Sequence, residues 1–202
     1  IQVRYLTEKA QKTFFYILKQ KIFFVSSHKS FTKILLIRFQ RFEEINNMKN
    51  IAINGLGRIG KLVVRRLFDV GLGTNLTQLN DLNSDSEMLA HLLEFDTVHG
   101  KWQKSVSWEE GEIVIDDVHL KLTNQNNKAK VNSSEIDLLI DCTGSIKNSQ
   151  DANTYFESGI PQVLVSAPVN DEKARNIVFG VNHEIYNGPE NLVFTAASCT
   201  TN

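Results

Sequence analysis

The fold of this chain is decided by residues 51–60, which read IAINGLGRIG. An apolar run typical of a strand leads into the pattern G-x-G-x-x-G, whose glycines are Gly55, Gly57 and Gly60. Gly55 permits a sharp turn, Gly57 leaves room for a pyrophosphate beside the backbone, and Gly60 lets the following helix pack closely on the strand. The helix N-terminus presents unpaired N–H groups to an anion. The stretch therefore predicts a dinucleotide-binding turn; the alternative is a tight strand-to-helix turn that binds nothing.

Strands and helices alternate from Met48 onward. Short apolar runs predict strands over residues 50–54, 76–80, 137–141, 162–166 and 192–196, and helical periodicity predicts helices over residues 58–70, around 84–93 and over 149–158. Residues 112–115 and 118–123, joined across Asp116 and Asp117, predict a hairpin. This alternation predicts an α/β fold: a doubly wound, Rossmann-type and mostly parallel sheet with helices on both faces.

The second of these helices has a start signal of its own. Ser84 and Glu87 have the spacing of a capping box, in which each side chain accepts a hydrogen bond from the backbone of the other. We expect the apolar face of this helix to consist of Met88, Leu89, Leu92 and Leu93.

Asp81 ends the second expected strand, about 20 residues beyond Gly60. An acid at this place accepts hydrogen bonds from the adenosine ribose hydroxyls and repels a 2′-phosphate, which favours NAD over NADP. The pair Asn80-Asp81 also suits a plain turn or helix cap, so both readings of Asp81 stay open at this point.

The composition is that of an ordinary soluble globular protein, with 202 residues, 42% hydrophobic and 22% charged. The formal net charge of −1 argues against a nucleic acid or a membrane surface as the partner of the whole chain. Residues 1–47 differ, since they carry nine Lys or Arg against three Glu and hold seven of the twelve Phe. We expect them to be an extension outside the functional protein, which would start at Met48; a transit peptide and a basic amphipathic helix are the alternatives.

The two cysteines, Cys142 and Cys199, are too few and too far apart for a disulfide framework, and no C-x-x-C occurs. This usage favours a reducing compartment and a cytoplasmic location. The five histidines form no i, i+4 pair and have no cysteine at ligand spacing, so the sequence predicts no metal site.

Cys199 lies just after the last expected strand, between Ser198 and Thr200, where a new helix could begin. A helix N-terminus lowers the pKa of a thiol and makes it nucleophilic near neutral pH. Small hydroxyl side chains at such a place also suit an anion. Most cysteines are small buried hydrophobic residues, and Cys142, which ends an apolar run, fits that description better than Cys199.

Seven motifs together resemble glyceraldehyde-3-phosphate dehydrogenase. They are residues 53–60 (INGLGRIG), 80–82 (NDL), 95–100 (FDTVHG), 142–144 (CTG), 166–168 (SAP), 180–183 (GVNH) and 197–202 (ASCTTN). The resemblance runs from Met48 to Asn202 in order and with the spacing of the family, and the last motif is the most specific.

The resemblance implies an NAD-dependent oxidative phosphorylation of glyceraldehyde 3-phosphate to 1,3-bisphosphoglycerate by a homotetramer, with inorganic phosphate as the second substrate. The Cys199 thiolate would attack the aldehyde, hydride would pass to the cofactor, and phosphate would cleave the thioester. By matching position, the family assigns the pyrophosphate to Arg58 and Ile59 in the glycine turn, the ribose to Asp81, the middle of the cofactor to Thr143 and Gly144, the nicotinamide side to Ser166, and substrate or inorganic phosphate to Ser198 and Thr200.

The chain also departs from the family. A basic residue usually stands near the adenine where residues 125–127 read QNN, which puts an adenine contact at Asn126 in doubt. The general-base histidine and substrate domain would lie beyond Asn202. We therefore expect an NAD-binding domain over residues 48–196, the start of a truncated catalytic domain over 197–202, and no activity from this chain alone. An erythrose-4-phosphate dehydrogenase and a non-catalytic NAD-binding module are the alternatives.

Overall fold

The computed structural model describes residues 50–126, 135–169, 171–177, 182 and 192–195. The strands are β1 (Ile51–Asn54), β2 (Leu76–Asn80), β3 (Phe95–Asp96), β4 (Gly100–Lys101), β5 (Val106–Glu109), β6 (Glu112–Ile115), β7 (Val118–Thr123), β8 (Leu138–Asp141), β9 (Gln162–Val165), β10 (Arg175–Asn176) and β11 (Leu192–Thr195). The helices are α3 (Arg58–Asp69), α4 (Ser86–Glu94) and α5 (Asn153–Glu157), with short 3-10 turns at η2 (Gly73–Asn75) and η4 (Ser149–Ala152).

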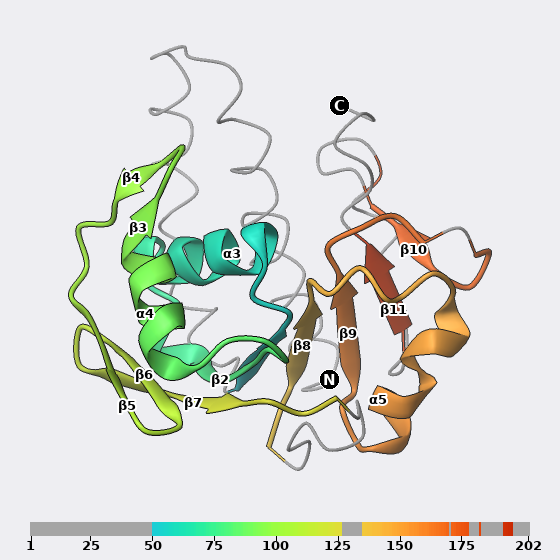
Figure 1. The fold of residues 1–202 in the computed structure, drawn as a ribbon. Helices are drawn as coiled ribbons and strands as arrows, with labels where there is room; N and C mark the ends of the chain where they lie inside the picture. Colours follow the sequence, from blue (N-terminus) through green and yellow to red (C-terminus); the bar gives the residue numbers. More distant parts are fainter. Residues whose placement is uncertain (1–49, 127–134, 170, 178–181, 183–191, 196–202) are drawn as a thin grey trace.

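Nine of these strands form one sheet, in the order β10-β11-β9-β8-β1-β2-β7-β6-β5 (Figure 1). Neighbouring strands run parallel from β10 through β7, and β6 and β5 continue the sheet in antiparallel fashion. The described residues of the central strands β1 and β8 are all buried, because helices cover both faces of a parallel sheet. The doubly wound α/β fold predicted from the sequence is confirmed.

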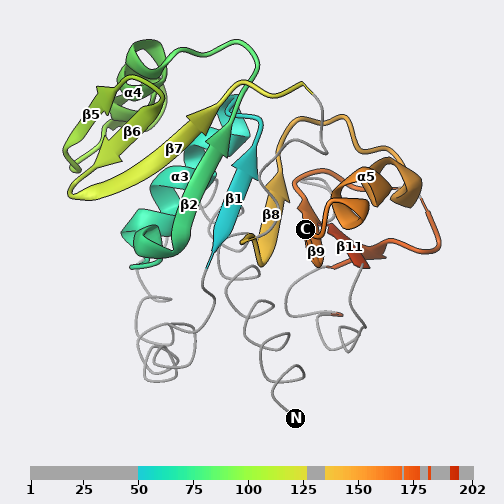
Figure 2. The same cartoon turned by 90° about the horizontal axis from the view of Figure 1, so that it is seen from below.

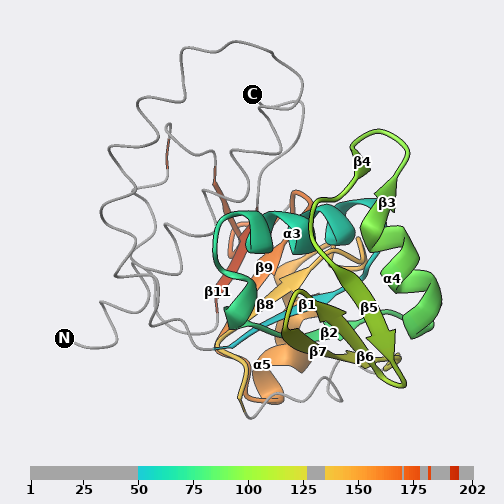
Figure 3. The ribbon, with the colours of Figure 1, turned by 90° about the vertical axis from the view of Figure 1, so that its left-hand side faces the viewer.

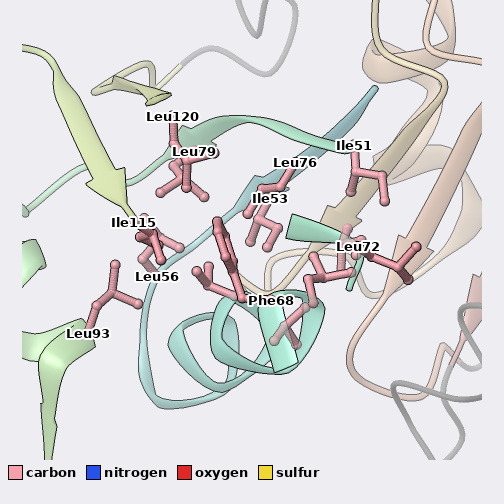
Figure 4. Packing of buried hydrophobic residues seen from close by; sticks show 14 of the residues in the cluster. Ile51, Ile53, Leu56, Phe68, Leu72, Leu76, Leu79, Leu93, Ile115 and Leu120 are labelled. Carbon is pink, nitrogen blue, oxygen red and sulfur yellow. The ribbon is translucent and has the colours of Figure 1, made fainter. Parts of the chain in front are cut away.

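Two hydrophobic cores lie on opposite faces of the sheet. Helices α3 and α4 pack on one face and α5 on the other (Figure 2). The alternation along β1 divides its side chains between them, since Ile51 and Ile53 belong to the first core and Ala52 belongs to the second. Figure 4 shows the first core, in which Phe68 of α3 packs with the sheet residues. Within the described residues, no helix has both the length and the apolar composition needed to cross a membrane.

Arg65 fastens α3 to the C-terminal end of α4. Its guanidinium is buried and donates hydrogen bonds to the carbonyl oxygens of Leu93 (2.8 Å) and Glu94 (3.0 Å). It also donates to the Gly100 carbonyl at 3.2 Å, on the small ribbon formed by β3 and β4. The last carbonyls of a helix have no partner within it, and Arg65 supplies one for the buried residue Leu93.

The predicted capping box of α4 is wrong. The cap is Asp85, whose side chain accepts a hydrogen bond from the Met88 N–H at 2.7 Å, while the Ser84 hydroxyl donates to Asp81 instead. The apolar face also differs, because the buried positions are Leu89, Ala90 and Leu93, and Met88 is 42% exposed. Ser84 and Asp85 both have side chains that can cap a helix. The Ser84 hydroxyl is bonded to Asp81 in the loop after β2, and Asp85 supplies the cap.

The hairpin of β6 and β7 is confirmed, with its two-residue connection at Asp116 and Asp117. Asp116 has a φ of 51° and links the turn to the segment before β5, because the Lys104 ammonium lies 2.8 Å from its carboxylate. Strand β5 was not predicted; it extends the sheet beside α4 (Figure 3). Its residues are mostly exposed, so they lack the apolar pattern that marks the central strands.

Candidate nucleotide-binding site

The strand order reverses between β1 and β8. From β1 the chain crosses to β2 on one side, and after β7 it returns to β8 on the other side of β1. Ligands of doubly wound sheets bind at such a reversal, beyond the carboxyl ends of the strands. Here the loops at that place are the glycine turn after β1 and residues 142–145 after β8.

The three glycines of the turn differ in what surrounds them. Gly55 has a φ of +87°, and a Cβ there would lie 2.8 Å from the Thr143 nitrogen, so the turn and the β8 loop touch. A Cβ on Gly60 would lie 2.0 Å from the carbonyl oxygen of Gly55. A Cβ on Gly57 would meet no heavy atom within 4 Å. The turn is thus closed on the protein side at Gly55 and Gly60 and open at Gly57, where α3 begins.

The start of α3 is arranged to receive a negative charge. Gly57 is the N-cap, no side chain caps the first turn, and no acidic residue stands in it. No side chain of the first turn therefore offsets the partial positive charge at this end of the helix, which can attract an anion. Arg58 and Ile59 supply the first residues of the helix at this place.

Asp81 ties the loop after β2 to the glycine turn. Its Oδ2 accepts a hydrogen bond from the Leu56 N–H at 2.7 Å, and its Oδ1 accepts from the Asn83 N–H (3.0 Å) and the Ser84 hydroxyl (3.1 Å). Sequence reasoning missed the contact with Leu56, because it depends on the parallel pairing of β1 with β2. A carboxylate has about four acceptor positions, so these three hydrogen bonds do not conflict with the predicted contact to a ribose.

The loop after β8 contains two of the predicted cofactor residues. The N–H and the hydroxyl of Thr143 both donate to Asp141 Oδ1, at 3.0 and 2.6 Å, and the Ser145 N–H donates to the Thr143 hydroxyl at 3.0 Å. Gly144 has a φ of +72° with open space beside its Cα. The structure therefore brings Thr143 and Gly144 together with the glycine turn.

The loops after β9 and β7 border the same edge. The Ser166 N–H donates to the Asp141 carbonyl at 2.9 Å, which places the start of the β9 loop beside the β8 loop. On the other side, the Asn124 amide donates to the carbonyls of Asp81 (2.7 Å) and Ser84 (2.9 Å). Asn126 follows in this loop and is exposed. Cys199, Ser198 and Thr200 lie outside the described residues.

In the described part of the chain, one group of side chains has metal-ligand chemistry: Glu109, Glu112 and His119 on the antiparallel edge of the sheet. Their ligand atoms lie within 4.8 Å of one another, and the His119 Nδ1 is 2.9 Å from the Glu112 carboxylate. The hydrogen bond with Glu112 raises the pKa of His119 above its ordinary value. The histidine spacings in the sequence do not reveal this group, because strand pairing brings its members together.

The sheet, its reversal point and the loops around it define a dinucleotide-binding domain of the doubly wound class. Residues 49–149 match the family described as the NAD binding domain of glyceraldehyde 3-phosphate dehydrogenase. The chain belongs to this family, and its domain is an NAD-binding domain. The resemblance seen in the sequence motifs and the prediction of NAD as the cofactor are confirmed.

Curated proteins that are similar to this chain carry the name of the same family. The chain is 36% identical over 154 residues to glyceraldehyde-3-phosphate dehydrogenase 3 of a Nostoc species, over 75% of this chain and 45% of the relative. It is 36% identical over 157 residues to glyceraldehyde-3-phosphate dehydrogenase of Clostridium pasteurianum, over 77% and 46%. The enzyme of Mycoplasma pneumoniae is 34% identical over 154 residues, over 75% and 45%. The chain thus spans about half the length of the curated relatives it matches.

Proposed function

We propose that the protein to which this chain belongs catalyses the NAD-dependent oxidative phosphorylation of glyceraldehyde 3-phosphate to 1,3-bisphosphoglycerate. The Cys199 thiolate adds to the aldehyde carbon and forms a hemithioacetal. Loss of a hydride from that carbon leaves a thioester on the sulfur, and NAD held by the glycine turn and the loop after β8 would supply the hydride acceptor. Inorganic phosphate then attacks the thioester carbonyl, and the thiolate departs as the acyl phosphate forms.

The position of Cys199 after β11 is the observation that carries this proposal. β11 runs parallel to β9, β8 and β1, so its carboxyl end at Thr195 points to the same edge as the glycine turn. Three strand spacings separate β11 from β1, or about 14 Å. Cys199 stands four residues beyond Thr195, and an extended chain of that length spans about 14 Å. The thiol therefore has the reach to meet a cofactor bound at the reversal point.

Each loop then has a role in this reaction. The open side of Gly57 and the first N–H groups of α3 would hold the pyrophosphate, and Asp81 would accept hydrogen bonds from the adenosine ribose. The remaining assignments are Thr143 and Gly144 for the middle of the cofactor, Ser166 for the nicotinamide side, and Ser198 and Thr200 for phosphate groups. We further propose that residues 48–196 form the NAD-binding domain, that residues 197–202 begin the catalytic domain, and that the whole protein is a homotetramer.

The test uses the intact protein and follows NADH formation from glyceraldehyde 3-phosphate, NAD and inorganic phosphate. Cys199→Ser should abolish activity, and iodoacetamide should inactivate the wild type by modifying Cys199, as peptide mapping would show. Cys142→Ala is the matched control and should keep both the activity and the sensitivity to iodoacetamide, because Cys142 packs beside the first core. Activity retained by Cys199→Ser would refute the proposal. Faster turnover of erythrose 4-phosphate than of glyceraldehyde 3-phosphate would identify erythrose 4-phosphate as the substrate.

A further inference from the structure

Polar side chains form a hydrogen-bonded row across the carboxyl ends of four neighbouring strands, beneath the loops of the proposed site. The row consists of Asp141 on β8, Asn54 on β1, Asn80 on β2 and Thr123 on β7, with Tyr155 of α5 inserted between Asp141 and Asn54. Tyr155 and Asp141 are fully buried, and Asn54 and Asn80 are 7% and 2% exposed. Buried polar groups need partners, so a continuous row is stable only when each member is satisfied.

Every contact in the row is a direct hydrogen bond. The Tyr155 hydroxyl donates to Asp141 Oδ2 at 2.9 Å and accepts from the Asn54 amide nitrogen. The Asn80 amide nitrogen donates to Asn54 Oδ1 at 2.8 Å, and the Thr123 hydroxyl donates to Asn80 Oδ1 at 2.7 Å. Tyr155 is the member of the row that comes from a helix, and its hydroxyl joins the β8 half to the β1 half.

The row holds the start of three loops at the site. The second oxygen of Asp141 accepts both hydrogen bonds from Thr143, which shape the loop after β8. The Asn80 side chain accepts from the Gln125 N–H at 2.8 Å, at the loop after β7. Asn54 directly precedes the glycine turn, and its carbonyl accepts from the Cys142 N–H at 2.7 Å.

We propose that Tyr155 is a positioning residue of the NAD site, which acts through Asp141 and Asn54 to preset the loop at residues 143–145 and the glycine turn before the cofactor arrives. The inference rests on the proposed site. Burial raises the pKa of Tyr155, so the hydroxyl keeps its proton and serves Asp141 as a donor at all ordinary pH values.

Removing the hydroxyl should loosen the loop without emptying the core. Tyr155→Phe keeps the ring in the second core but leaves the Asn54 amide without its acceptor and Asp141 Oδ2 without its donor. We expect amide hydrogen exchange at Thr143 and Ser145 in the NAD-free chain of 202 residues to rise about tenfold, the effect of one lost buried hydrogen bond.

The matched control is Ser158→Ala, which deletes another hydroxyl just after α5. That hydroxyl donates to the Tyr155 backbone carbonyl at 2.7 Å and is not part of the row. Exchange at Thr143 and Ser145 should stay at the wild-type rate in this variant, and exchange at Leu120, in the antiparallel hairpin, should stay unchanged in both variants. Uniformly faster exchange across the sheet in Tyr155→Phe, or no change at Thr143 and Ser145, would overturn the proposal.

NAD titrations, followed by the amide shifts of residues 55–60, form the second arm. Tyr155→Phe should weaken NAD binding about tenfold by the same lost hydrogen bond, whereas a purely structural residue would lower the unfolding free energy and leave the affinity of the folded chain unchanged. Equal NAD affinity in the variant and wild type therefore overturns the positioning role. A wild-type chain that shows no NAD-dependent shifts contradicts the proposed site, and the exchange arm still decides the role of Tyr155.

Asn54→Ser provides a second route if Tyr155→Phe does not fold. The shorter side chain cannot span from β1 to both Tyr155 and Asn80, so the Tyr155 hydroxyl loses its anchoring contact while the aromatic core stays intact. Exchange at Thr143 should again rise, and an unchanged rate would refute the coupling of the two loops through the row.

Discussion

Gly60→Ala offers the sharpest test of the glycine turn. The new methyl carbon would lie 2.0 Å from the Gly55 carbonyl oxygen and 3.0 Å from its carbonyl carbon. Contacting heavy atoms normally stand about 3.5 Å apart, so α3 and the turn must separate by about 1 Å or more. Both atoms belong to the backbone, and Gly55 is itself wedged against Thr143, so no flexible side chain can yield.

Two effects of opposite sign decide the magnitude. Overpacking a tight contact costs about 1–3 kcal/mol, and a rigid backbone obstacle places Gly60→Ala at the upper end of that range. Alanine in place of glycine within a helix regains about 1 kcal/mol. The steric effect is larger, and we expect the free energy of unfolding to fall by about 2 kcal/mol.

Urea unfolding followed by circular dichroism measures this loss, with Gly57→Ala as the matched variant. Gly57 has an extended backbone with a φ of −64°, and a Cβ there meets nothing within 4 Å, so Gly57→Ala should cost only the difference between glycine and alanine at an N-cap, about 0.5–1 kcal/mol. If the proposed pyrophosphate site is correct, Gly57→Ala should nevertheless lose NAD binding. A Gly60→Ala chain as stable as the wild type would refute the close packing of α3 on the turn.

Two further predictions concern other parts of the molecule. Asp85→Ala should destabilise the chain by about 1 kcal/mol through loss of the α4 cap, while Ser84→Ala should change stability less; the reverse ranking in urea unfolding would restore Ser84 as the cap. The pKa of His119 is raised by Glu112, so this ion pair stabilises the fold fully below about pH 6.5 and is lost as the pH rises through the raised pKa. An NMR titration should therefore give His119 a midpoint above about 6.5 that Glu112→Gln lowers, and equal midpoints would argue against the pair.

The central sheet was predictable because its strands are buried on both faces. Ile51–Asn54 and Leu138–Asp141 are continuous apolar runs that end in a polar residue. Such a run indicates a buried parallel strand whichever strands become its neighbours. Strand β5 was missed for the opposite reason: Val106–Glu109 is mostly exposed, and its pairing with Glu112–Ile115 makes it a strand. The two-residue strand at Arg175–Asn176 likewise exists through its pairing with β11.

The motifs predicted which loops would border the candidate site, but not the hydrogen bonds that connect these loops. The glycine turn and Thr143 could be assigned from motifs, since each motif carries its own local signal. The hydrogen bond from Leu56 to Asp81 and the one from the Tyr155 hydroxyl to Asp141 depend on which elements become neighbours in space. A buried tyrosine after β8 does give a weak signal, because its hydroxyl needs a partner, but the sequence does not say which one.

The close contact between Gly55 and Thr143 joins segments that are far apart in the sequence, so it can form only late in synthesis of the chain. The pairing of β1 with β8 joins Ile51 to Leu138, 87 positions further along the chain. The glycine turn therefore lacks its contact with Thr143 until the segment after β8 has been synthesised. Until then one margin of Ile51–Asn54 has no neighbour, and an unpaired strand margin invites association with other chains. A nascent chain paused before residue 138 should therefore bind chaperones.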